Sequence, residues 1–131
     1  MSQENEIENK SVSVDRRIKA LEFFKDWTNY LLVTTVAALG WVTKPGLDFS
    51  PPGLKLACIW CLSASIVFAI LTLALIPHIS EQMKEDEKSI YKVKASFYIF
   101  GIQCRSRLKN ACFPQHVLFL AGVIIYSIGV V

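Results

Sequence analysis

The residues of this sequence best suited to chemistry are two cysteines three positions apart, in the segment Cys58-Ile-Trp-Cys61. At the first turn of a helix this spacing brings two thiols within disulfide reach, and the positive end of the helix dipole favours the reactive thiolate. Cys58 and Cys61 are therefore a candidate redox pair for thiol–disulfide exchange. The simpler interpretation, which we favour, is that both are small buried side chains with a packing role.

A Cys-x-x-Cys pattern at the outer end of a membrane span resembles the membrane thiol oxidoreductases of the DsbB and vitamin K epoxide reductase type. The resemblance implies four or more spans around a quinone and a second cysteine pair on the same side. This chain departs on both counts, because three spans are predicted and Cys104 and Cys112 are predicted to lie on the cytoplasmic side. A thiol oxidoreductase is kept as the alternative function, and we expect no enzyme.

Other reactive constellations are weaker. A zinc site built from Cys104, Cys112 and His116 would lack the close ligand pairs of structural zinc sites, and no fourth ligand is evident. Glu22 and Asp26 share a helix face near basic residues and are expected to be solvated. The sequence has no phosphate-binding loop, metalloprotease motif or nucleophile elbow. We therefore predict no catalytic residue, no metal and no cofactor.

Small side chains recur every four residues around the cysteine pair. They are Ala57, Cys61, Ser65 and Ala69. Such a stripe lets helix backbones approach closely in lipid, so we predict a helix-packing stripe here. Similar small pairs in the neighbouring segments are Thr34 with Ala38 and Gly122 with Gly129. The stripe fits packing within one chain and self-association of several chains equally well.

These residues lie in or beside three apolar blocks, at about 27–42, 56–76 and 113–131. Of the 131 residues 53% are hydrophobic and 19% are charged, against about 25% charged in ordinary soluble domains. The second block is long enough to cross a bilayer, whereas the first covers only about 24 Å. Pro77 is expected to end the second block and Pro114 to stand at the start of the third helix. We predict an all-α membrane protein with three transmembrane helices.

Basic residues are concentrated before the first block and between the second and third, while the turn at 43–55 holds only Lys44 and Lys55. The positive-inside rule therefore places residues 1–26 and the loop 77–112 in the cytoplasm, and the C-terminus outside. The membrane would be a plasma membrane or a bacterial inner membrane. The chain is thus divided into a cytoplasmic segment, 1–26, and a three-span domain, 27–131.

The two cytoplasmic segments are expected to be partly helical. An amphipathic interfacial helix is predicted to start near Asp15 as its N-cap. In the loop, residues 80–94 carry mixed charges at helical spacing, and the apolar residues 95–102 suit the headgroup layer. Basic residues expected to contact lipid headgroups or a partner are Arg16, Arg17, Lys19, Arg105, Arg107 and Lys109.

The leading functional interpretation is a non-enzymatic integral membrane protein that oligomerises or binds a partner, as an anchor, an adaptor or a membrane-perturbing, pore-forming effector. Its expected partners are the lipid bilayer, a second copy or another membrane protein, and a cytoplasmic protein that contacts 1–26 and 80–109. Nucleic acid is not expected, because no basic, aromatic-bearing soluble face is present. Ion-coupled transport is disfavoured because the three blocks hold no charged side chain. A small channel ranks third, since no selectivity filter is recognisable.

Overall fold

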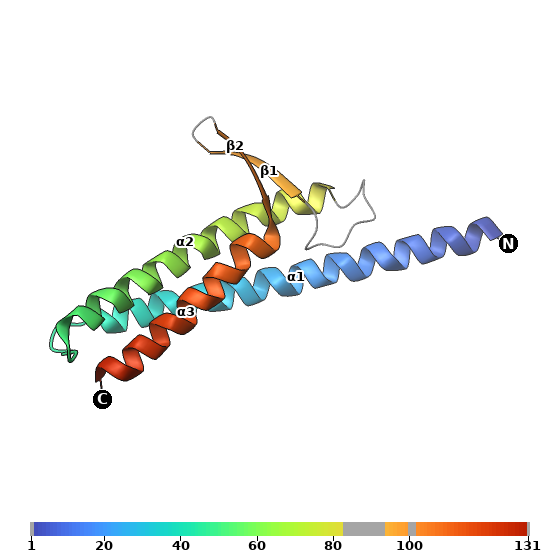
Figure 1. Ribbon diagram of the computed structural model, residues 1–131. Helices are drawn as coiled ribbons and strands as arrows, with labels where there is room; N and C mark the ends of the chain where they lie inside the picture. The colour runs from blue at the N-terminus through green and yellow to red at the C-terminus, as the bar shows by residue number, and fades with distance from the viewer. Residues whose placement is uncertain (1, 83–93, 100–101, 131) are drawn as a thin grey trace.

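The computed structural model describes residues 2–82, 94–99 and 102–130 of the chain (Figure 1). Three long helices dominate it: α1 (Ser2–Val42), α2 (Pro52–Gln82) and α3 (Leu108–Val130). A two-stranded antiparallel hairpin, β1 (Lys94–Ile99) and β2 (Ile102–Arg107), lies between α2 and α3 in the sequence. The predicted helical class is confirmed for the three main elements.

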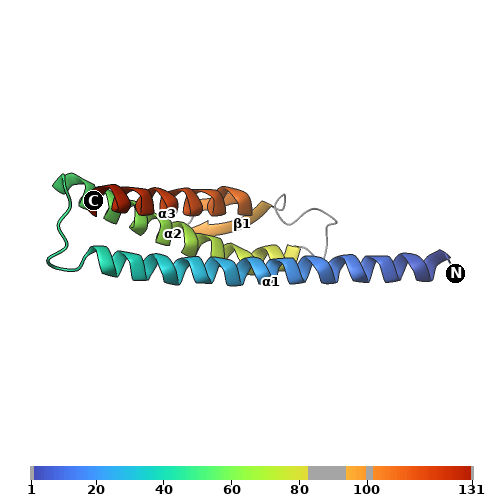
Figure 2. The ribbon, with the colours of Figure 1, turned by 90° about the horizontal axis from the view of Figure 1, so that it is seen from below.

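The helices run up, down and up. α2 is antiparallel to both α1 and α3 and packs against each of them (Figures 1 and 2). The turn after α1 and the C-terminal end of α3 lie at one end of the bundle, and the hairpin lies toward the other end. The N-terminal half of α1 extends past the hairpin end as a straight arm (Figure 2). We call residues 2–26 the α1 arm.

Each helix buries side chains at seven-residue intervals. Buried positions seven residues apart are Leu21, Thr28, Thr35 and Val42 in α1, and Leu108, Gln115, Gly122 and Gly129 in α3, where Ala111 is buried as well. In α2 steps of four and three residues alternate along Cys58, Leu62, Ser65, Ala69, Thr72, Ile76 and Ile79. A period of 3.5 residues keeps one stripe of each helix facing its neighbours when helices cross at a shallow angle.

Two helices in the described part of the chain, α2 and α3, are long and apolar enough to cross a membrane. With 31 and 23 residues they exceed the roughly 30 Å of a bilayer core. Many of their large apolar side chains face outward, including Trp60 of α2 and Phe113 of α3. The apolar part of α1 does not meet the same criterion, because it is shorter and directly follows Lys25 and Asp26.

The helices are longer than predicted. α1 begins at Ser2, so the predicted start with Asp15 as N-cap is wrong. α2 continues through Pro77 to Gln82, which contradicts the predicted end at the proline. Pro77 is exposed while Ile76 and Ile79 on either side are buried, so packing of the neighbouring residues outweighs the one backbone hydrogen bond that proline cannot donate.

α3 also begins earlier than expected. Its first residue is Leu108, so Pro114 lies inside the helix and not at its start. Leu108 and Ala111 are buried in a cluster with Leu21 and Ile79. Burial of these two side chains stabilises helical turns that the apolar block alone did not indicate.

The loop between α2 and α3 is not simply a helical extension. β1 pairs with β2 in a register that runs from Lys94 opposite Arg107 to Ile99 opposite Ile102. The sequence did not predict these strands, although their aromatic and β-branched residues suit a sheet. Most of the predicted helical segment 80–94 lies outside the described residues, and α2 accounts for its first three positions.

Candidate functional site

The cysteine pair lies inside α2 and not at its first turn, because the helix already begins at Pro52. Cys58 is fully buried, and its thiol donates a hydrogen bond to the carbonyl oxygen of Gly122 at 3.3 Å. Cys61 is half-buried beside it, and both thiols are free. The geometry thus gives Cys58 a packing contact with α3.

The predicted packing stripe is divided by the structure. Ser65 and Ala69 are buried, whereas Ala57 and Cys61 are half-buried at the edge. A four-residue repeat advances about 40° around a helix at each step, so it leaves the buried stripe of α2 within a few turns. Ser65 Oγ donates to the carbonyl oxygen of Gln115 at 2.9 Å. At Ser65 the stripe is therefore in contact with α3 of the same chain.

Two glycines of α3 mark the closest contacts of that helix. A Cβ on Gly122 would stand 2.8 Å from Leu62 Cδ2, so glycine lets α3 approach α2. A Cβ on Gly129 would overlap the ring of Phe49 in the turn after α1. The Ser50 N–H also donates to the Gly129 carbonyl at 3.1 Å, which satisfies one of the free acceptors at the end of the helix. The Phe49 contact and this hydrogen bond hold the turn against the end of α3.

Two indole groups tie α1 to α3. The Trp27 indole N–H donates to His116 Nε2 at 3.1 Å, and the Trp41 indole N–H donates to the Tyr126 hydroxyl at 3.1 Å. Because Nε2 of His116 accepts, the proton of the neutral ring is on Nδ1, which lies 2.9 Å from the Cys112 carbonyl oxygen. His116 therefore serves as an interhelical acceptor.

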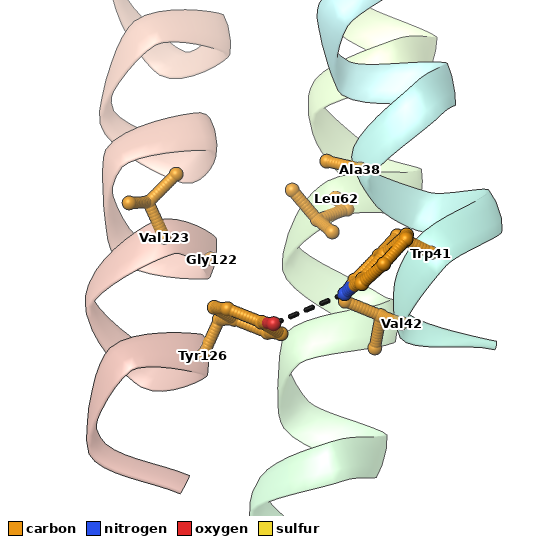
Figure 3. A pocket seen from close by; sticks show the side chains of 7 residues that line it. All are labelled: Ala38, Trp41, Val42, Leu62, Gly122, Val123 and Tyr126. Carbon is orange, nitrogen blue, oxygen red and sulfur yellow. Dashed lines mark hydrogen bonds between the residues drawn. The ribbon is translucent and has the colours of Figure 1, made fainter. Parts of the chain in front are cut away.

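A hollow lies between α1 and α3, close to the turn that follows α1 (Figure 3). Its volume is about 150 Å³. α2 forms its floor with Leu62, and the Trp41–Tyr126 hydrogen bond crosses it (Figure 3). Further lining residues are Ala38, Gly122 and Val123. We call this hollow the α1–α3 groove; it is apolar and opens outward, since Trp41 and Val123 remain exposed.

The predicted headgroup contacts lie on three different elements. Arg16, Arg17 and Lys19 are on the α1 arm, Arg105 and Arg107 are on β2, and Lys109 is on the first turn of α3. All of these elements are on the side of the bundle opposite the turn (Figure 1). Among the described residues no cluster of His, Cys, Asp and Glu could hold a metal ion.

The structure adds one position that the sequence reading overlooked. Gln115 is fully buried, and neither its side-chain oxygen nor its nitrogen has a hydrogen-bond partner. The available signal was an amide side chain within an otherwise apolar block.

Comparisons with protein families, curated proteins and solved structures find no match to this chain. The functional argument therefore depends on the geometry alone.

Proposed function

We propose that the protein is a non-enzymatic membrane anchor with three spans, formed by residues 27–42 of α1, by α2 and by α3. The observation that carries this proposal is the unbroken helix α1, which joins the charged α1 arm directly to an apolar segment packed on α2. A movement or a load applied to the arm is transmitted to the bundle without a flexible joint. The arm is the surface that meets a cytoplasmic partner.

The outward-facing side chains support a lipid environment. Trp60 of α2 is 69% exposed and Phe113 of α3 is 71% exposed, and a soluble monomer rarely exposes a continuous apolar surface of this kind. The buried hydroxyls of Thr28, Thr35 and Thr72 each donate to a carbonyl one turn earlier. These polar groups are therefore satisfied within their own helices, as a helix in lipid requires.

The charge distribution supports one orientation. The α1 arm and the hairpin carry most of the basic residues, while the opposite end has Lys44 and Lys55 in or beside a short turn. By the positive-inside rule the arm is cytoplasmic, and the turn and the end of α3 are outside. On the arm Val12 and Phe23 are exposed among charged residues, which suits a helix that binds a protein partner.

The decisive experiment asks whether α1 crosses the membrane. The four cysteines are replaced by serine, single cysteines are introduced as Ser11→Cys in the arm and Asp48→Cys in the turn, and a membrane-impermeant maleimide is added to intact cells. We expect D48C to be labelled at once and S11C only after the membrane is disrupted. Labelling of both positions from the same side would show that α1 does not cross. Release of the chain by alkaline carbonate would overturn the membrane assignment itself.

A further inference from the structure

We infer that the chain binds one anionic glycerophospholipid at the turn end of the bundle, with an acyl chain in the α1–α3 groove and the phosphate beside Lys44. The inference rests on the proposed membrane-spanning function, and it adds a specific ligand. The inference is based on two adjoining hollows. One is the apolar α1–α3 groove, the other is lined in part by Lys44, and Trp41 lines both.

The apolar hollow suits a hydrocarbon chain. Its walls are Ala38 and Trp41 on one side and Gly122 and Tyr126 on the other, with Leu62 beneath (Figure 3). A groove of about 150 Å³ lined by apolar groups has room for a segment of a hydrocarbon chain, since apolar cavities of this size accept hydrocarbon ligands. Ala38 has a small side chain and Gly122 has none, which leaves space between the two helices. In a bilayer the adjacent hydrocarbon is a lipid chain.

The second hollow provides the charge. It has a volume of about 270 Å³ and is lined by Trp41, Lys44 and the turn residues 45–47. The Lys44 ammonium lies 5.2 Å from the centroid of the Trp41 ring, and within the described residues no carboxylate forms an ion pair with it. Lys55, in contrast, donates to the Leu47 carbonyl at 2.8 Å and is already engaged. Lys44 is the lysine at this end that is available to an anion.

The two hollows are arranged as a phospholipid requires. Lys44 follows the last residue of α1, Val42, by two positions, so the cation lies at the end of the span and the groove lies directly below it. Tryptophan favours this boundary between headgroups and hydrocarbon. One amphiphile with a negative phosphate therefore fits both hollows, whereas a purely apolar ligand would leave Lys44 unpaired. A basic residue near the membrane surface raises the affinity for an anionic headgroup about fivefold relative to a headgroup without net charge.

The test uses quenching of Trp41 by lipids brominated on their acyl chains. The variant W27F/W60F, which keeps Trp41 alone, is reconstituted in equal mixtures of phosphatidylglycerol and phosphatidylcholine, with one or the other lipid brominated. We expect brominated phosphatidylglycerol to have an apparent affinity about fivefold higher at Trp41. Lys44→Gln should reduce this ratio to about one, while the control Lys109→Gln at the other end should leave it unchanged. Ala38→Phe should weaken quenching by filling the groove.

Equal quenching by the two lipids, a ratio unaffected by K44Q, or quenching unaffected by A38F would overturn the inference. Native mass spectrometry provides a second measurement. The unsubstituted chain should retain one phosphatidylglycerol, and K44Q should retain it in a smaller fraction of molecules. The variant W27F/W41F, which keeps the exposed Trp60, separates the two proposals. If Trp60 is not quenched by either lipid, the membrane function fails; if Trp60 is quenched but Trp41 shows no preference, only the lipid site fails.

Discussion

Gln115 has a polar side chain in surroundings that offer it no hydrogen-bond partner. Its amide is fully buried with no hydrogen-bond partner, although its backbone carbonyl accepts from Ser65. An unsatisfied buried amide costs about 1 to 3 kcal/mol. We therefore expect Gln115→Met, which keeps a similar length without the amide, to raise the free energy of unfolding by about that amount. Unfolding in mixed micelles with increasing denaturing detergent would measure it, and a less stable variant would show that the amide is paired in the folded protein.

The glycines of the helices allow a matched test of the closest contact. At Gly122 a Cβ would press on Leu62, whereas at Gly40 nothing lies within 4 Å of such an atom. Gly122→Leu should therefore destabilise the fold by about 1 to 3 kcal/mol through overpacking. Gly40→Leu introduces the same side chain without the clash and should be neutral or slightly stabilising. Equal effects of the two substitutions on thermal unfolding would argue against the α2–α3 contact.

The Trp27–His116 hydrogen bond is a third contact open to measurement. A double-mutant cycle with Trp27→Phe and His116→Leu removes the donor and the acceptor separately. Because the two groups are bonded at 3.1 Å, the coupling free energy should be about 0.5 to 1.5 kcal/mol. The control cycle combines Tyr30→Phe with His116→Leu, since Tyr30 is exposed and its hydroxyl has no bond to His116. That cycle should show a coupling close to zero.

At the scale of the elements, the length of α1 is the finding with most consequence for function. A helix that bent at the membrane surface would bring its two halves closer together, whereas a straight helix holds them apart. Spin labels at Ser11 and Ala37 are separated by 37 − 11 = 26 residues, or about 39 Å along a continuous helix. We expect a narrow distance distribution near this value, by pulsed electron paramagnetic resonance. A broad distribution at shorter distances would indicate a joint between the arm and the span.

Much of the helical content was predictable, and the errors have physical causes. The second and third apolar blocks became α2 and α3 because long uncharged segments have few alternatives to a helix. The helix ends were misplaced because Pro77 and Pro114 were treated as boundaries, although buried neighbours such as Ile79 and Leu108 hold the helix on both sides. The hairpin was missed because its short alternating strands follow a charged segment that has helical spacing.

The candidate site was predictable only in fragments. Ser65 and Ala69 were recognised from their small side chains, and both are buried, whereas Ala57 and Cys61 of the same stripe are only half-buried. The α1–α3 groove could not be deduced, since it combines residues far apart in the sequence, such as Trp41 and Tyr126, which are separated by 85 positions. The offset between two helices depends on their packing against a third, and no local pattern reports it. The hydrogen-bond acceptor of Cys58 is a backbone carbonyl oxygen, and no sequence pattern identifies such an acceptor.

At the scale of the whole molecule, the turn after α1 and the end of α3 form one unit. Phe49 is 7% exposed and packs edge-on against Tyr126, with ring centroids 5.9 Å apart. Phe49→Ala should destabilise the fold by about 3 kcal/mol, as expected for loss of a buried aromatic ring. It should also make the turn more sensitive to protease in proteoliposomes. The exposed Phe23 is a matched control, and Phe23→Ala should change neither property.

The fastening of Phe49 and Ser50 to Gly129 also sets an order of events during synthesis. The two partners are separated by 129 − 49 = 80 residues, which a ribosome adds in on the order of ten seconds. Throughout that interval the aromatic ring of the turn lacks its contact with Gly129, and α2 is completed within the same interval, before α3. The pair formed by α1 and α2 therefore lacks part of its packing until α3 is made, and in the proposed membrane anchor this incomplete pair is the species that enters the bilayer first.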